Sequence, residues 1–169
     1  MKKYLQLLRA KHYIKNFLVI LPMFFGGAFF DKSRISNAFL GVIAFCMLSS
    51  VVYIINDYKD IEKDRKHPTK KNRPLASGAI SSRNAVIVGV LLVIGVLLCS
   101  VAIGSLSALL LLMVYLSLNC AYSLGLKNKP IIDVVILASG YVIRVFYGGA
   151  ITDVSVSKWL YLVVVDSVK

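Results

Sequence analysis

Five long apolar runs, each close to the length that crosses a lipid bilayer, limit what this chain can fold into. They cover residues 14–30, 35–56, 84–103, 106–124 and 131–151. About 20 apolar residues are needed for an α-helix to cross ~30 Å of hydrocarbon, and helices satisfy all their backbone polar groups there. The first run is the weakest because Pro22 interrupts it. We therefore expect an all-α, polytopic transmembrane bundle of about five spans, with a sixth beginning at Trp159, and residues 1–169 forming a single transmembrane domain.

Composition and charge agree with a membrane protein. Hydrophobic residues make up 58% of the chain and charged residues only 17%. The net charge of +12 does not indicate nucleic-acid binding, because Lys and Arg gather between the apolar runs and not along one amphipathic face. Cysteines 46, 99 and 120 lie inside apolar runs without the pair spacing of a metal site. We expect a membrane environment, and neither a nucleic-acid partner, a disulfide framework nor a zinc site.

Lys and Arg are distributed unequally between the two sides of the expected membrane. Five lie in the N-terminal segment, at positions 2, 3, 9, 11 and 15, eight lie within residues 59–83 and two lie at positions 127 and 129. The opposite side has only Lys32, Arg34 and Lys158. The positive-inside rule then places the N-terminus and the loop after the second run in the cytoplasm of an integral plasma-membrane protein. A cleaved signal peptide is the alternative for the first run, but further spans follow it.

A polar motif, NDYKDIEKD (residues 56–64), follows the second run without a linker. If the helix continues, Asp57, Asp60 and Asp64 lie on one face, and Asn56 lies one turn before Asp60. Such a row of carboxylates repels itself unless a cation occupies it, and hard oxygen ligands suit Mg²⁺ carried on a phosphorylated substrate. We predict that Asn56, Asp57, Asp60 and Asp64 bind Mg²⁺, with Asp57 and Asp60 as catalytic residues and the site on the cytoplasmic face.

Cations follow the acidic motif closely. Arg can hold phosphate oxygens through two parallel hydrogen bonds, so this cluster could neutralise a bound diphosphate. A solvated cytoplasmic loop is the simpler alternative, but the helical spacing of the carboxylates favours a site, as do Pro74 and Gly78, which end the polar segment before the next run. From the cluster we select Lys70 and Arg73 as phosphate ligands.

The motif NDYKDIEKD matches the N-D-x-x-D-x-x-x-D signature of the UbiA superfamily of membrane prenyltransferases, and RPLASG (residues 73–78) resembles the segment that follows it there. Three stretches are similar to the branch that moves phosphoribose onto a polyprenyl phosphate. They are LRAKHYIKNFLVILPMFF, HPTKKNRPLASG and YSLGLKNKPIIDVVILASGYVIRVFYGGA. The resemblance extends from about Arg9 to Trp159.

This resemblance implies a Mg²⁺-dependent transferase that takes phosphoribose from 5-phosphoribosyl diphosphate, a phosphorylated small-molecule donor, to a polyprenyl (decaprenyl) phosphate. Two alternatives stay open. One is a prenyltransferase that moves an isoprenyl group from a prenyl diphosphate lipid to an aromatic acceptor such as 4-hydroxybenzoate. The other is an inactive truncated membrane remnant. Full members of the superfamily have about nine spans and a second polar motif, so we expect this chain to be the N-terminal part of a UbiA-type domain.

The resemblance also bears on polar residues near the later spans. Arg144 lies inside the fifth run, where a charge costs about 3 kcal/mol, so it should face the bundle interior. It is either a structural cation bonded to backbone carbonyls or, as the resemblance implies, a contact to substrate phosphate. Lys127 either belongs to an ordinary positively charged turn or, as the resemblance implies, binds phosphate in the same cavity. Tyr122 and Lys15 complete the predicted substrate-binding residues.

Overall fold

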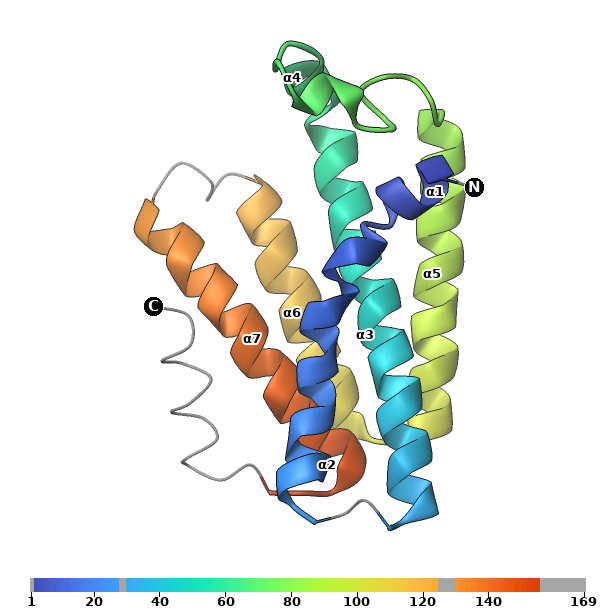
Figure 1. The fold of residues 1–169 in the computed structure, drawn as a ribbon, viewed down its shortest axis with the longest axis vertical. Coiled ribbons are helices and arrows are strands. Elements are labelled where there is room, and N and C mark those ends of the chain that lie inside the picture. Colours follow the sequence, from blue (N-terminus) through green and yellow to red (C-terminus); the bar gives the residue numbers. More distant parts are fainter. Residues whose placement is uncertain (1, 28–29, 125–129, 156–169) are drawn as a thin grey trace.

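The computed structural model describes residues 2–27, 30–124 and 130–155, and this part of the chain is helical without strands (Figure 1). The elements, in chain order, are α1 (Lys2–Leu7), the 3₁₀ segment η1 (Ala10–Ile20), α2 (Leu21–Phe25), α3 (Lys32–Lys59), α4 (Ile61–Arg65), the 3₁₀ turn η2 (Lys70–Asn72), α5 (Ser82–Ile103), α6 (Leu106–Leu124) and α7 (Pro130–Thr152). The predicted all-α transmembrane bundle is confirmed.

Four of these helices, α3, α5, α6 and α7, are long and apolar enough to cross a membrane. They alternate in direction, so that α3 ends and α5 begins at one end of the bundle, and α5 ends and α6 begins at the other (Figure 1). Side-chain caps begin two of them: Asp31 accepts from the backbone of Ser33 and Arg34 before α3, and Ser81 accepts from the backbone of Asn84 before α5. The short helices α4 and η2 cover the end at which α3 finishes.

The first predicted span, residues 14–30, is wrong as one continuous helix. Residues 14–25 belong to η1 and α2, which meet at Leu21, and neither is one of the four long apolar helices. Pro22 is the second residue of α2. Proline has no backbone N–H and is tolerated only in the first turn of a helix, so the segment starts a new helix there. The predicted sixth span, from Trp159, lies outside the described residues.

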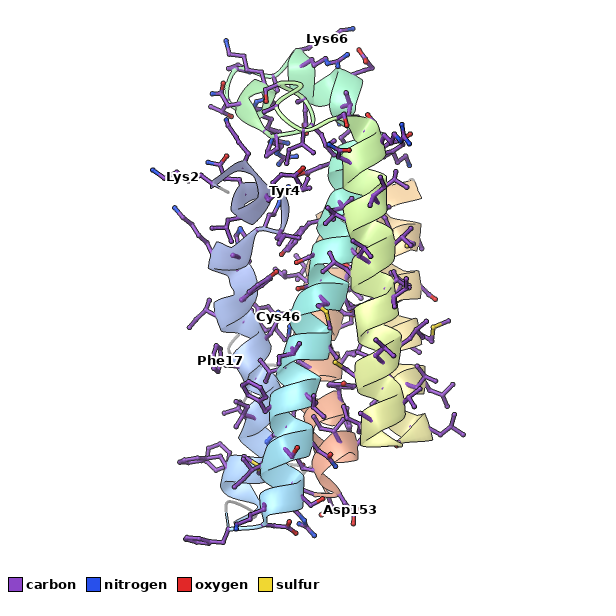
Figure 2. The ribbon with its side chains drawn as sticks, turned by 90° about the vertical axis from the view of Figure 1, so that its right-hand side faces the viewer. Lys2, Tyr4, Phe17, Cys46, Lys66 and Asp153 are labelled. Carbon is purple, nitrogen blue, oxygen red and sulfur yellow. The ribbon has the colours of Figure 1, made fainter. Side chains whose placement is uncertain are left out.

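An aromatic core joins α3, α6 and α7. The ring of Phe45 lies 4.8 Å from that of Tyr115 and 5.5 Å from that of Tyr147, measured between centroids. Helix α5 packs mainly against α3, and large apolar side chains such as Leu91 and Leu98 are exposed along it. Figure 2 shows side chains projecting from the outer surface of η1, including that of Phe17. Exposed apolar side chains of this kind suit helices that face lipid.

Gly148 on α7 allows the backbone of η1 to approach closely. A Cβ at this position would overlap the carbonyl oxygen of Val19 and lie 3.1 Å from Cδ of Pro22. We expect Gly148→Ala to lower the stability of the protein in detergent by about 1–3 kcal/mol, because a backbone neighbour cannot move aside cheaply. Gly89→Ala on α5 is the matched control, since its Cβ would meet only Ile54 at 3.9 Å. Equal melting temperatures for the two variants would contradict this packing.

Candidate active site

The signature motif lies where α3 ends. Helix α3 finishes at Lys59, Asp60 has backbone angles of φ −92° and ψ 7°, and α4 begins at Ile61. The supposed continuation of the helix through all three aspartates is therefore interrupted, because the chain turns at Asp60. The turn nevertheless brings the buried carboxylates of Asp57 and Asp64 to the same guanidinium nitrogen.

That nitrogen is Nη1 of Arg73, which follows η2. It donates to Oδ1 of Asp57 at 3.1 Å and to Oδ2 of Asp64 at 2.8 Å. Both carboxylates are almost fully buried, at 3% and 2% exposure. A buried charge is tolerated only when it is paired, so Arg73 has a structural reason to lie here. Arg73 thus lies beside the motif, where it contacts two of the proposed metal ligands. Its predicted role as a phosphate ligand stays a prediction.

A second arginine, Arg9, also reaches Asp57, and the sequence reasoning missed it. Its Nη2 donates to Oδ1 of Asp57 at 2.6 Å, and its guanidinium lies 4.6 Å from the centre of the Tyr53 ring. Arg9 joins α1 to η1 in a left-handed backbone conformation, with φ 51° and ψ 45°, which is uncommon for a residue other than glycine. Its position ahead of the first apolar run looked like an ordinary positive-inside charge, which hid this contact.

The signature carries the oxygen-bearing side chains from which a Mg²⁺ site could be built. Within residues 2–27, 30–124 and 130–155 no group of three or more His, Cys, Asp or Glu side chains is arranged to hold a metal. Asp57 and Asp64 do converge on one positively charged group, Nη1 of Arg73, which takes the position between the two carboxylates that a metal ion would take. The arginine contacts fall on Oδ1 of Asp57 and Oδ2 of Asp64, one oxygen of each carboxylate. Carboxylate and amide oxygens are ligands that Mg²⁺ prefers, so Asn56, Asp57, Asp60 and Asp64 have suitable donor chemistry, although the three carboxylates are not gathered around one point in the structure.

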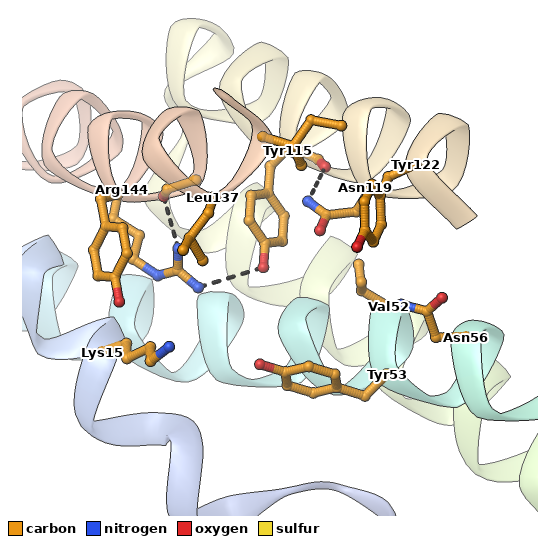
Figure 3. Close-up of a pocket in the computed structure, with 12 residues that line it drawn as sticks. Lys15, Val52, Tyr53, Asn56, Tyr115, Asn119, Tyr122, Leu137 and Arg144 are labelled. Carbon is orange, nitrogen blue, oxygen red and sulfur yellow. Dashed lines mark hydrogen bonds between the residues drawn. The ribbon is translucent and has the colours of Figure 1, made fainter. Parts of the chain in front are cut away.

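A pocket of about 320 Å³ opens between η1, α3, α6 and α7 beside the signature (Figure 3). Tyrosines, amides and two cations provide its polar lining. Six of these residues are Lys15, Tyr53, Asn56, Asn119, Tyr122 and Arg144. The pocket therefore joins Asn56 of the signature to Lys15, Tyr122 and Arg144, three residues predicted to bind substrate.

Arg144 is buried at the α7 wall of this pocket, with 7% exposure. Its Nε donates to Oδ1 of Asn16 at 2.9 Å and its Nη1 to the carbonyl of Gly140 at 2.7 Å. Its Nη2 lies 3.3 Å from the Tyr115 hydroxyl (Figure 3). Its guanidinium also lies 4.8 Å from the centre of the Phe45 ring. In the described part of the chain, no carboxylate forms an ion pair with it. Arg144 thus combines a backbone contact with a position from which its uncompensated charge can attract an anion.

Helix α6 meets the signature through Ser123. The hydroxyl oxygen of Ser123 lies 2.7 Å from Oδ1 of Asn56 and 2.9 Å from the carbonyl oxygen of Asn119. Lys59 donates from its amine to the carbonyl of Ser123, in the last turn of α6, where a cation interacts well with the helix dipole. These contacts set the position of the Asn56 amide relative to the pocket.

The remaining predicted residues divide by location. Tyr122 lines the pocket, and so does Lys15, whose Nζ lies 5.6 Å from the centre of the Tyr141 ring. Lys70 lies on η2 with an exposed side chain. Lys127 lies outside the described residues, so its predicted role stays a prediction.

Comparisons with known proteins identify relatives of the chain. Residues 19–165 match the model of the UbiA prenyltransferase family. The chain is 33% identical over 159 residues to a decaprenyl-phosphate phosphoribosyltransferase of Corynebacterium glutamicum, covering 92% of this chain and 48% of the relative. It is 35% identical over 162 residues to the enzyme of that name from Mycolicibacterium smegmatis, covering 92% of this chain and 50% of the relative. The chain thus spans about half the length of these curated relatives.

Solved structures agree on the fold. A UbiA homolog from Archaeoglobus fulgidus bound to GPP and Mg²⁺ matches with a TM-score of 0.78 and 25% identity, over 98% of this chain and 59% of that one. A digeranylgeranylglyceryl phosphate synthase structure matches with a TM-score of 0.76 and 23% identity, over 99% of this chain and 59% of that one. Because the family model matches most of its length, the chain belongs to the UbiA prenyltransferase family.

Proposed function

We propose that this chain forms the donor-binding part of a Mg²⁺-dependent transferase that moves phosphoribose from 5-phosphoribosyl diphosphate to a polyprenyl phosphate. The proposal keeps residues 1–169 as the N-terminal part of a UbiA-type domain. The observation that carries it is the pocket that joins Asn56 of the signature to the buried Arg144, which pairs with no carboxylate among the described residues. A donor with phosphate groups at both ends of a sugar could place one of them at the signature and the other at Arg144. The similarity to phosphoribosyltransferases supports the same donor.

The residues present can perform a transfer of this kind. Asn56, Asp57, Asp60 and Asp64 would hold Mg²⁺, which when bound neutralises charge on the leaving diphosphate. Arg73 would hold the remaining phosphate charge through its guanidinium. The acceptor phosphate is already an anion, so its oxygen can form the new bond to C1 of the ribose as the bond from C1 to the diphosphate breaks, without a dedicated general base. Lys15, Tyr122 and Arg144 would orient the donor in the pocket.

A prenyl diphosphate is the second candidate donor. The Archaeoglobus fulgidus homolog was solved with GPP and Mg²⁺ and matches 98% of this chain. Tyrosines in the pocket lining, among them Tyr53, Tyr115 and Tyr141, also offer the faces that an isoprenoid could pack against. The transfer of an isoprenyl group to an aromatic acceptor would use the same metal and diphosphate chemistry.

Binding of the two donors to the purified chain in detergent tests the proposal. We expect 5-phosphoribosyl diphosphate to bind more tightly than geranyl diphosphate, and only when Mg²⁺ is present, by calorimetry. A Mg²⁺-dependent preference for geranyl diphosphate would favour the prenyltransferase alternative. Binding of neither donor would contradict a donor site in this chain.

Ser123→Ala tests how the Asn56 amide is oriented. The Ser123 hydroxyl donates to Oδ1 of Asn56 at 2.7 Å, so it fixes the amide oxygen that we propose as a metal ligand and leaves the second lone pair of that oxygen for the ion. We expect Ser123→Ala to weaken the Mg²⁺ affinity about tenfold, as is typical for the loss of a partner that orients a metal ligand. Ser123→Thr keeps the hydroxyl and should restore the affinity. The same Mg²⁺ affinity in Ser123→Ala and in the native chain would argue against this role.

A further inference from the structure

The two buried carboxylates of the signature are balanced by two arginines before any metal is present. Asp57 and Asp64 carry two negative charges, and Arg9 and Arg73 carry two positive charges within 3.1 Å of them. Both carboxylates are nearly fully buried, so interactions between charges here are screened much less than in water. A divalent cation bound by the same carboxylates would leave an excess of positive charge. Such an excess is costly in a buried site unless one of the guanidinium groups leaves.

The two arginines are not held equally. Arg73 bridges Asp57 and Asp64, whereas Arg9 pairs with one carboxylate, that of Asp57, and otherwise lies over the Tyr53 ring. Arg9 also belongs to the N-terminal segment and not to the loop that carries the motif. Its left-handed backbone, with φ 51°, is a conformation that costs free energy and is kept only while the surroundings hold it. Moving Arg9 away from the site would therefore break fewer ion pairs than moving Arg73.

We propose that Arg9 is an internal counter-ion that occupies Asp57 before the metal arrives and that a divalent cation must displace. The inference rests on the proposed Mg²⁺ site and adds a competitor to it. Arg9 neutralises the buried carboxylate in the metal-free protein and so stabilises the fold. It lowers the apparent affinity for Mg²⁺ because part of the binding free energy is spent on breaking the contact of 2.6 Å.

The test measures Mg²⁺ alone, without donor, on the full chain in detergent. We expect Arg9→Gln to bind Mg²⁺ about tenfold more tightly than the native chain, the size of one partly exposed charge-assisted hydrogen bond. Lys11→Gln is the matched control, because it removes the same charge from an exposed position on the same segment and should leave the Mg²⁺ affinity unchanged. An arginine that only binds donor phosphate would not change the affinity for the metal alone.

The outcomes separate this inference from the proposed function. If the native chain binds Mg²⁺ and Arg9→Gln binds it equally or more weakly, the competition is refuted while the metal site stands. If neither chain binds Mg²⁺, the metal site is refuted and the competition with it. Tighter binding by both Arg9→Gln and Lys11→Gln would attribute the effect to net charge and would also refute displacement.

A measurement on the native chain avoids any variant that folds poorly. Phenylglyoxal modifies accessible arginines, and peptide mass spectrometry reports the rate at each one. The rate at Arg9, whose side chain is 25% exposed, should increase when Mg²⁺ is added at constant ionic strength. Arg34, at the opposite end of α3, serves as the internal reference. An unchanged rate at Arg9 in Mg²⁺ that saturates the chain would refute displacement.

Discussion

Arg144→Met is expected to weaken the binding of 5-phosphoribosyl diphosphate about 100-fold, because removing a desolvated charge that meets an opposite charge costs roughly 2–5 kcal/mol. Methionine keeps much of the packing volume against Phe45 and Tyr115 but provides neither the charge nor the hydrogen bonds. The measurement is donor affinity by calorimetry with Mg²⁺ present, together with the melting temperature of the apo protein.

The control for this variant is Arg34→Met. Arg34 lies in the first turn of α3, at the opposite end of that helix from the signature, and pairs with Asp31 with its side chain partly exposed, so its removal should leave donor affinity unchanged. If Arg144→Met instead lowers the melting temperature but binds the donor as well as the native chain, Arg144 is a structural cation. That is the alternative that the sequence left open, and the contact with the Gly140 carbonyl would then be its main role.

Asp60→Asn is expected to reduce Mg²⁺-dependent donor binding by at least about 100-fold, because even groups that only orient metal ligands cost 10–100-fold when they are lost. Asp60 lies at the turn between α3 and α4, where its N–H donates to the carbonyl of Asn56 at 3.0 Å. Asparagine has nearly the same shape and can adopt the same turn. Membrane insertion and melting temperature should therefore be preserved.

Glu62→Gln is the matched control for Asp60→Asn. It neutralises a carboxylate two residues away, on the exposed side of α4, where Glu62 pairs with Arg65 at 2.7 Å. An exposed pair of this kind contributes little to stability, and Glu62 is not a position of the signature. Equal losses of donor binding in the two variants would mean that the total charge of the loop matters and not the metal ligands.

The fold class could be predicted because the thickness of the bilayer sets the number of apolar residues that a spanning helix needs. The residue ranges of helices α3, α5, α6 and α7 agree closely with those of the four later predicted runs. The first run could not be predicted as accurately, since a count of apolar residues does not distinguish an α-helix from a 3₁₀ segment followed by a new helix at Pro22.

The site was predicted in part. Asp57 and Asp64 could be found from their spacing, and Arg73 from its place after them. Arg9 could not, because it lies 48 residues before Asp57 and reaches it only through the packing of the N-terminal segment. The contact of Ser123 with Asn56 could not be predicted either, because a serine at the end of an apolar run indicates no partner until α6 is known to lie beside α3. The metal and substrate roles of all these residues stay predictions.

The coil of η1 also determines where Arg9 can reach. A 3₁₀ helix advances about 2.0 Å per residue and an α-helix about 1.5 Å, so rewinding these eleven residues as α-helix would shorten the segment by about 5 Å. Gly148 holds the segment against α7 at Val19, so that shortening would fall on the Arg9 end. The guanidinium would then be drawn back by roughly one α-helical turn from Asp57. The longer rise per residue of the 3₁₀ segment η1 thus keeps the Arg9 guanidinium within reach of Asp57.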